Sequence, residues 1–237
     1  MKRNLTIGTR RSQLALWQAN YVADALRRHD PEQSVQLQHL VTPGDKILDG
    51  PLALIGGKGR FTTELERCLL DGTIDLAVHS LKDLPADVPD GLCLAAITAR
   101  HHVHDAFVSN TYATLESLPA GACIGTSSLR RRAQLLHTRP DLVVSDLRGN
   151  VDTRLKKLDD GQYDAIILAE AGLQRLGRAD RIGQLLPVTT MIPAVGQGAL
   201  AIETRADDMS LRQALAFLNA QDTAAAATAE RAFLAAI

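Results

Sequence analysis

Short apolar runs alternate with helical patterns along almost the whole chain, and this alternation constrains the fold more than any other feature. Residues 5–8 are typical of a strand, 12–28 place apolar side chains at helical spacing, and 35–41 are again strand-like. Further strands are expected at 75–80, 92–97, 105–109, 122–126, 142–146, 165–170 and 199–204. Strands that alternate with helices are typical of βαβ units. We therefore predict an α/β fold with mainly parallel, mixed sheets.

Two breaks in composition predict that the chain forms two hinged lobes. A chain of 237 residues, 46% of them hydrophobic, is long enough for two ordinary domains. A polar run at 98–104 separates two strands, and a proline with two glycines at 191–198 precedes the final strand. If the chain crosses between lobes at both places, lobe 1 is discontinuous (1–98 plus 199–217) and lobe 2 spans 103–192. The long Gly-rich segment at 43–59 is a candidate active-site flap.

Composition excludes several classes of function. A formal net charge of -1 and only 3% aromatic residues argue against a nucleic-acid binder. Residues 1–8 lack the apolar core of a signal peptide, and no stretch reaches transmembrane length. Three widely spaced cysteines among apolar neighbours indicate neither disulfides nor a zinc site, and favour a reducing cytosol. We expect no metal, because the histidines at 101, 102 and 104 have no neighbouring carboxylate cluster in the sequence.

Residues 125–154 resemble a built anion site. Ser128 is a natural helix N-cap, which places Arg130 and Arg131 in the first turn, at the positive end of the helix dipole. Cations there cost about 0.3 to 1 kcal/mol each, and a bound polyanion would reverse that sign. Hydroxyl groups that could join the arginines belong to Thr126, Ser127 and Ser128. The alternative is a solvated basic helix face, but a second cluster, Arg148-Gly149-Asn150, favours the anion site.

Polar clusters follow several predicted strands at their carboxyl ends, where ligands bind in open α/β sheets. They begin at Arg10, Ser80, Thr126 and Arg148. Among these cations Asp83 is a carboxylate that could stabilise a developing positive charge or move a proton while arginines hold the acid groups of a ligand. The alternative is an ordinary surface pair with Lys82. His79, inside an apolar strand, is expected to be a hydrogen-bonded structural histidine.

Six motifs occur in an order that makes the resemblance to one family specific. They are Thr9-Arg10-Arg11-Ser12-Gln13-Leu14-Ala15-Leu16, Gly56-Gly57-Lys58-Gly59, Ala77-Val78-His79-Ser80-Leu81-Lys82-Asp83, Gly125-Thr126-Ser127-Ser128-Leu129-Arg130-Arg131, Leu147-Arg148-Gly149-Asn150 and Pro193-Ala194-Val195-Gly196-Gln197-Gly198. Over essentially its whole length the chain resembles porphobilinogen deaminases, also called hydroxymethylbilane synthases. These enzymes of haem and porphyrin biosynthesis join four porphobilinogen molecules into a linear tetrapyrrole and release ammonia.

The resemblance implies a fold similar to type II periplasmic binding proteins, with the catalytic cleft between the lobes. It implies that Asp83 is the catalytic carboxylate, that Lys58 ends the flap, and that Gln197 lies near a crossing between lobes. Residues implied to bind substrate or cofactor are Arg10, Ser12, Ser80, Lys82, Thr126, Ser127, Ser128, Arg130, Arg131, Arg148, Gly149, Arg154 and Arg175. The implied protein is a cytoplasmic monomer that binds porphobilinogen and pyrrole oligomers, and neither nucleic acid nor membrane.

The sequence departs from the family at the cofactor anchor. The family attaches a dipyrromethane cofactor to a cysteine of a Gly-Gly-Cys segment in a small third α/β domain, shortly after a Thr-Ala-Glu-Arg helix. Residues 228–231 match that helix, but the sequence ends at Ile237. We therefore expect a truncated form in which 218–237 begin the third domain and no anchoring cysteine is present.

None of the three cysteines lies in a sequence context like that of the family's anchoring cysteine. The apolar neighbours of Cys68, Cys93 and Cys123 predict raised thiol pKa values. The rival hypothesis is a non-catalytic, two-lobed module that binds polycarboxylates. Asp83 argues against it, because a carboxylate sensor gains nothing from an anion in its site.

Overall fold

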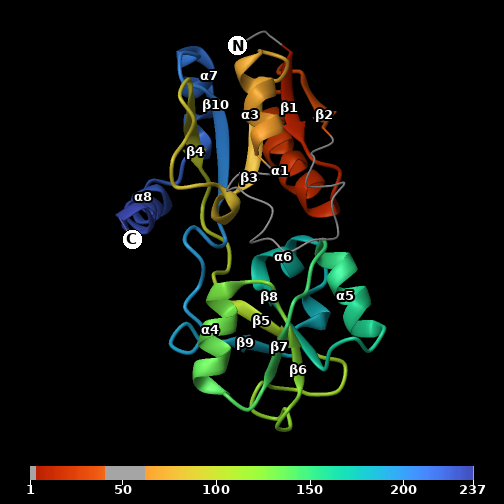
Figure 1. Cartoon of the computed structure of the whole chain (residues 1–237). Coiled ribbons are helices and arrows are strands. Elements are labelled where there is room, and N and C mark those ends of the chain that lie inside the picture. The colour runs from red at the N-terminus through yellow and green to blue at the C-terminus, as the bar shows by residue number, and fades with distance from the viewer. Residues whose placement is uncertain (1–3, 41–61, 237) are drawn as a thin grey trace. The chain divides into compact units, whose positions relative to one another are not determined.

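The computed structural model describes residues 4–40 and 62–236 (Figure 1). The chain divides into two compact units: unit 1 is Met1–His101 with Val195–Ile237, and unit 2 is His102–Ala194. The expected flap at 43–59, with Lys58, lies outside the described residues. Among the described residues, no helix combines the length and the apolar character that crossing a membrane requires.

Unit 1 is built on a five-stranded sheet in the order β2-β1-β3-β10-β4. Its strands are β1 (Leu5–Thr9), β2 (Val35–His39), β3 (Leu76–Ser80), β4 (Leu92–Ile97) and β10 (Leu200–Arg205). β1 pairs in parallel with β2 and β3, whereas β10 runs antiparallel to β3 and β4. The sheet is therefore mixed, as predicted, with parallel pairing on one side of β3 and antiparallel pairing on the other. Leu200 lies opposite Ser80, so the start of β10 adjoins the carboxyl end of β3.

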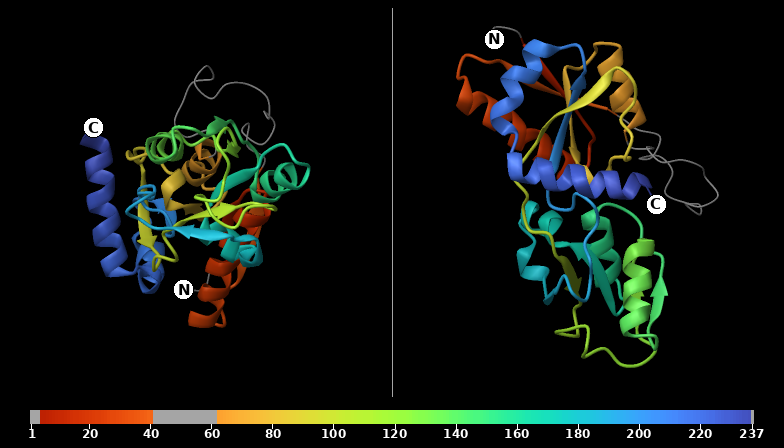
Figure 2. Two further views of the ribbon diagram at one scale, coloured as in Figure 1. Left: turned by 90° about the horizontal axis from the view of Figure 1, so that it is seen from below. Right: turned by 90° about the vertical axis from the view of Figure 1, so that its left-hand side faces the viewer.

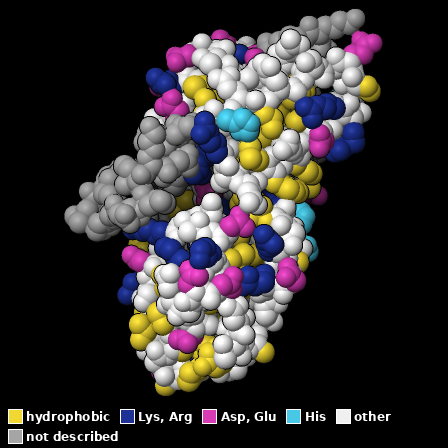
Figure 3. All heavy atoms as spheres, turned by 90° about the vertical axis from the view of Figure 1, so that its right-hand side faces the viewer, with side chains coloured by type: hydrophobic (Ala, Val, Ile, Leu, Met, Phe, Trp, Pro, Cys, Tyr) yellow, Lys and Arg dark blue, Asp and Glu magenta, His cyan; other side chains and the backbone are white. Residues whose placement is uncertain are grey.

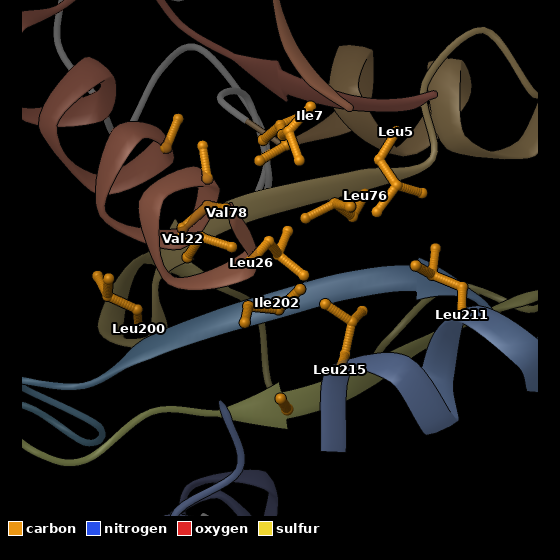
Figure 4. Packing of buried hydrophobic residues seen from close by; sticks show 14 residues of the cluster. Leu5, Ile7, Val22, Leu26, Leu76, Val78, Leu200, Ile202, Leu211 and Leu215 are labelled. Carbon is orange, nitrogen blue, oxygen red and sulfur yellow. The ribbon is translucent and has the colours of Figure 1, made fainter. Parts of the chain in front are cut away.

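Helices cover both faces of this sheet because the side chains of its strands alternate between them. The helices of unit 1 are α1 (Gln13–His29), α3 (Thr63–Leu70), α7 (Met209–Leu215) and α8 (Gln221–Ala236), with 3-10 turns η1 (Leu81–Asp83) and η3 (Ala216–Leu218). Leu76 and Val78 of β3 pack with Val22 of α1 (Figure 4). Ala77, between them, packs instead with Leu65 of α3.

Helix α8 packs beside β4 within unit 1 (Figure 2). Ala227 is fully buried, in a cluster with Leu81 and Leu84. The Arg231 Nη2 donates hydrogen bonds to the carbonyls of Pro85 and Ala86, at 2.7 and 2.8 Å. Apolar and polar contacts together thus hold α8 against the segment that follows η1.

Unit 2 repeats the architecture, with a five-stranded sheet in the order β7-β6-β8-β5-β9. Its strands are β5 (Asp105–Val108), β6 (Cys123–Gly125), β7 (Val143–Ser145), β8 (Ala165–Ala169) and β9 (Gln184–Leu186). β6 is parallel to β7 and β8, and β5 is antiparallel to β8 and β9. Asp105 lies opposite Ala169, so the first residue of β5 adjoins the carboxyl end of β8.

Hydrogen-bonded caps begin two of the helices of unit 2. Its helices are α4 (Leu129–Thr138), α5 (Val151–Asp159) and α6 (Glu170–Arg175), with the turn η2 (Ala179–Arg181). Ser128 caps α4, as predicted, and Asn150 caps α5. Phe107 is fully buried in a core with Ile124 and Leu135. The strand β9 was not expected from the sequence.

Candidate active site

The predicted residues of unit 1 that the structure describes lie at one edge of its sheet. Arg10 and Ser12 follow β1, and Lys82 and Asp83 follow β3, at the carboxyl ends of two adjacent parallel strands. Gln197 precedes β10, which runs the other way, so that it reaches the same edge. The strand order explains why residues distant in sequence gather there.

Asp83 is presented to solvent by a turn whose apolar neighbours are buried. Leu81 and Leu84 pack into the cluster that includes Ala227, while Asp83 is exposed. Within the described part of the chain, no residue forms a hydrogen bond or ion pair with the Asp83 carboxylate. Lys82 does not pair with it, and its Nζ instead donates to Oε1 of the fully buried Gln197 at 3.3 Å. The surface Lys–Asp pair considered from the sequence is therefore not formed.

Gly196 allows the backbone to approach this turn closely. Its φ is +68°, and a Cβ there would lie 2.6 Å from Cγ of Leu81. The Gly196 N–H donates to Oε2 of Glu230 at 2.7 Å, and Glu230 pairs with Arg100 at 2.8 Å. The position of the turn that carries Asp83 is therefore tied to the start of β10 and to α8.

Two polar pairs organise the residues just before that turn. The His79 Nε2 lies 2.9 Å from Oε2 of Glu203, and both side chains are buried. This confirms that His79 is a hydrogen-bonded structural histidine. The Gln18 Nε2 donates to Oγ of Ser80 at 2.7 Å, so the hydroxyl predicted to bind ligand is already an acceptor for α1.

In unit 2 the predicted hydroxyl groups build the loop between β6 and α4. The Thr126 Oγ1 accepts from the Ser128 N–H at 3.2 Å, and the Ser128 Oγ accepts from the Arg131 N–H at 3.4 Å. The Ser127 Oγ donates to the Leu147 carbonyl at 3.0 Å. These bonds explain the Thr-Ser-Ser sequence by local structure, since they fix the entry to the helix.

The two arginines of the first turn of α4 share a buried carboxylate that the sequence analysis missed, Asp105. Arg131 donates to Asp105 Oδ1 from Nε at 3.2 Å and from Nη2 at 2.7 Å, and Arg130 Nη2 donates to Oδ2 at 2.7 Å. Arg131 is 6% exposed, so the alternative of a solvated basic face is wrong for it. Asp105 thus supplies within the chain part of the negative charge that the sequence analysis expects from a bound polyanion.

Burial and pairing act in opposite directions on these groups. Burial raises the pKa of Asp105, but the charges and hydrogen bonds of Arg131 and Arg130 outweigh it and lower that pKa below its ordinary value. Burial lowers the pKa of Arg130, although the Asp105 charge opposes this. The lowered pKa of Asp105 keeps its carboxylate ionised at neutral pH.

The remaining predicted residues of unit 2 follow β7 and β8. Gly149 has a φ of +114°, and its backbone lies close to the Thr153 side chain. A Cβ at this position would lie 2.6 Å from Cγ2 of Thr153. The Arg154 Nε donates to the Gly149 carbonyl at 2.8 Å. Arg148 is half-buried, and Arg175 is buried at the end of α6. The face of unit 2 in Figure 3 shows Lys and Arg side chains with acidic ones among them.

The structure places one carboxylate beside two of the histidines. Glu170, which is 2% exposed, lies near His102 (Oε1 to Nδ1, 3.3 Å) and His104 (Oε2 to Nδ1, 3.4 Å). A carboxylate is therefore present beside them, because α6 begins where β8 ends. Within residues 4–40 and 62–236, no group of three or more histidine, cysteine or acidic side chains is arranged to hold a metal ion.

None of the three cysteines belongs to a strand-end loop. Burial raises the pKa of the Cys68 thiol in α3, as predicted. Cys93 lies in β4 with its Sγ 3.6 Å from Oγ1 of Thr204, and Cys123, the first residue of β6, lies 3.3 Å from Oγ of Ser145. None follows the carboxyl end of a strand.

The arrangement of these motifs agrees with a comparison of the whole chain. The family model described as "Porphobilinogen deaminase, dipyromethane cofactor binding domain" matches residues 5–213. The chain belongs to the porphobilinogen deaminase family. The match spans both units, including the segments that carry Asp83, Asp105 and the arginines. At the level of the family, it identifies a domain that binds a dipyrromethane cofactor.

Solved structures of binding proteins share the fold at low identity. A periplasmic substrate-binding protein of an ABC transporter from Coxiella burnetii is 14% identical, with a TM-score of 0.57 over 95% of this chain and 96% of its own. A nutrient-binding protein from Burkholderia cenocepacia, bound to methionine, is 15% identical, with a TM-score of 0.54 and 90% of each chain covered. The lipoprotein Tp32 from Treponema pallidum is 14% identical, with a TM-score of 0.56, covering 91% of this chain and 90% of its own. These similarities confirm the predicted type II periplasmic-binding-protein fold.

Proposed function

We propose that this member of the porphobilinogen deaminase family binds porphobilinogen and acts as a hydroxymethylbilane synthase, a transferase that joins four porphobilinogen molecules with release of ammonia. The observation that carries the proposal is Asp83. It is an exposed carboxylate without a partner among the described residues, on a turn anchored by buried leucines, within a chain that matches this family. A fixed carboxylate that no neighbour neutralises is suited to chemistry that develops positive charge.

The condensation needs a group that stabilises positive charge and transfers a proton, and Asp83 can do both. Each step breaks the C–N bond of an aminomethyl group and forms a C–C bond to the next pyrrole. The departing amine takes up a proton, and the attacked pyrrole carbon gives one up. Asp83 would stabilise the cationic pyrrole and relay the proton between these positions.

Unit 2 would hold the carboxylates of the pyrrole side chains. Guanidinium groups suit this task because their fork of donors matches a carboxylate. Arg130 has its side chain 24% exposed, and its Nε donates to no other residue that the structure describes. It therefore retains a donor for a ligand. Arg148 lies in the loop after β7, Arg154 lies in the first turn of α5, and Arg175 is the last residue of α6.

The described residues also fit the non-covalent part of a dipyrromethane. Its acid groups match the guanidinium donors that unit 2 offers, such as Nε of Arg130. When bound, the cofactor supplies a pyrrole end to which further units are joined. We propose that no thioether forms at Cys68, Cys93 or Cys123, because none lies at a strand-end loop. Intact mass measurement tests this, and an adduct of two linked pyrroles on any of these thiols would contradict it.

The test of function compares two aspartates on the same segment. Asp83→Asn should keep porphobilinogen affinity within about twofold but lower ammonia release about 10²- to 10⁴-fold, the usual contribution of a positioned acid–base group. Asp90→Asn, at an exposed carboxylate seven residues further on, is the control and should change neither quantity. Binding is measured by calorimetry and ammonia by a coupled assay.

Three results would change the proposal. A folded wild-type chain that does not bind porphobilinogen would refute it. Binding without ammonia release in the wild type would favour the rival, a non-catalytic polycarboxylate-binding module. Near-normal ammonia release by Asp83→Asn would remove Asp83 from the mechanism.

We also propose that the protein is a cytoplasmic monomer. Free thiols at all three cysteines are compatible with a reducing compartment. Light scattering of the purified chain tests the oligomeric state, and fractionation of cells that express it tests the compartment.

A further inference from the structure

The first-turn arginines of α4 differ in what they have left to offer a ligand. Each of the three guanidinium nitrogens of Arg131 already has a partner within the chain: Nε and Nη2 donate to Asp105, and Nη1 donates to the Ile167 carbonyl at 3.0 Å. Its side chain is only 7% exposed. Arg131 is therefore part of the interior of unit 2.

Arg130 is held at two points and open at a third. Its Nη2 donates to Asp105 Oδ2, and its Nη1 donates to the Ile192 carbonyl. Nε has no acceptor among the described residues, and the side chain is partly exposed. A ligand carboxylate can therefore reach Arg130 without displacing the contact to Asp105.

Asp105 is placed to act on Arg130 by the topology of the sheet. It is fully buried at the start of β5, which is antiparallel to β8 and so begins at the edge where the parallel strands end. Each of its two oxygens serves a different arginine. Together the three side chains carry one net positive charge, which matches one carboxylate.

We propose that Asp105 is a positioning residue of the carboxylate site: it orients Arg130, which alone of the two first-turn arginines contacts the ligand, and Arg131 acts only through Asp105. This inference rests on the proposed function for the identity of the ligand. It differs from the expectation drawn from the resemblance, in which Arg130 and Arg131 both hold carboxylates.

A double-mutant cycle on porphobilinogen affinity separates positioning from general structural support. Arg130→Gln should weaken binding about 10- to 100-fold, as expected for a lost charged hydrogen bond. Asp105→Asn should weaken binding about three- to tenfold in the wild type and less than twofold in the Arg130→Gln background. Equal losses in both backgrounds, or an unchanged Kd in a folded Asp105→Asn protein, would overturn the proposal.

A matched control lies at the other end of the same helix. Asp141 pairs with Arg139 through two hydrogen bonds, at 2.8 and 2.7 Å, beyond the last turn of α4. Asp141→Asn therefore removes another Arg–Asp pair and should leave the Kd unchanged. If Asp105→Asn does not fold, Arg131→Lys replaces it in the cycle, because lysine keeps the charge but cannot span both contacts. The same pattern of losses is expected.

A second measurement does not depend on the ligand. In ¹⁵N relaxation experiments on the unliganded chain, the order parameter of the Arg130 Nε–H should fall in Asp105→Asn and remain unchanged in Asp141→Asn. Absence of porphobilinogen binding together with this fall would refute the proposed function but retain the positioning role. Porphobilinogen binding without any change in the Arg130 order parameter would refute the positioning role but retain the binding on which the proposed function depends.

Discussion

Replacing Arg131 with leucine should destabilise unit 2 strongly, because the change leaves a buried carboxylate with one cation in place of two. Asp105 is fully buried, and it loses two hydrogen bonds from Arg131. The Ile167 carbonyl loses a third. Breaking a buried ion pair from one side costs about 3 to 5 kcal/mol. Because Arg130 still pairs with Asp105, we expect the lower end, about 3 kcal/mol.

The effect is measurable by thermal unfolding. For a chain of this size, 1 kcal/mol shifts Tm by about 2 to 4 °C, so Arg131→Leu should lower Tm by about 6 to 12 °C. Circular dichroism follows the transition, and hydrogen exchange of peptides from α4 and β8 should show faster exchange in unit 2. Trp17, the sole tryptophan, lies in α1 and so reports on unit 1.

A control and a second variant test the reasoning. Lys156 pairs with Asp160 on the surface of α5, where its side chain is 73% exposed, so Lys156→Met should not change Tm measurably. The double variant Asp105→Asn/Arg131→Met should cost less than the sum of its parts, because no unpaired carboxylate remains. A Tm for Arg131→Leu within 2 °C of the wild type would show that the pair contributes little, and would refute the argument.

Three further predictions concern other contacts. The lowered pKa of Asp105 means that its stabilising effect is present above the unfolded pKa of about 4 and is lost as pH falls through the folded value. The urea midpoint of the wild type should therefore fall in acid, and that of Asp105→Asn should fall less steeply. Equal dependence of the two midpoints on pH would contradict this. Gly196→Ala should cost about 1 to 3 kcal/mol, since it adds the contact with Leu81 to a strained backbone. Gly161→Ala, at φ +73° with nothing within 4 Å, bears only the backbone cost, and an equal loss in urea denaturation would exclude the contact. Ser128→Ala should lower the free energy of unfolding by about 0.5 to 1 kcal/mol in the same assay, since the cap hydrogen bond is long. An unchanged free energy of unfolding would show that the cap does not contribute to stability.

Local sequence signals were sufficient for most of the regular elements. Ser12 and Ser128 cap the helices that they were expected to begin, because N-capping depends on a side chain and the backbone three residues away. The predicted strands 92–97 and 75–80 became β4 and, one residue shorter, β3. β9 was missed because only Leu186 of its three residues is buried, so that it carries no periodic signal.

Long-range pairing decided what the candidate site contains. Arg130 and Arg131 were found from the sequence because they follow a strand and break a local electrostatic rule. Their partner Asp105 lies about 25 residues earlier, at the beginning of a predicted strand, where a search of strand ends does not look. Glu170 escaped for a related reason, since its closeness to His102 and His104 depends on the pairing of β5 with β8.

By itself, the sequence determined the α/β class, the caps of the helices and the strand-end loops that carry Asp83 and the arginines, because these depend on contacts between residues a few positions apart. Only the tertiary structure decided which polar and charged side chains lie next to those loops. The reversed strands β10 and β5 bring Gln197 and Asp105 to the edges where parallel strands end. Burial then makes Asp105 an obligatory partner of the arginines, since an unpaired carboxylate in the core is too costly to keep.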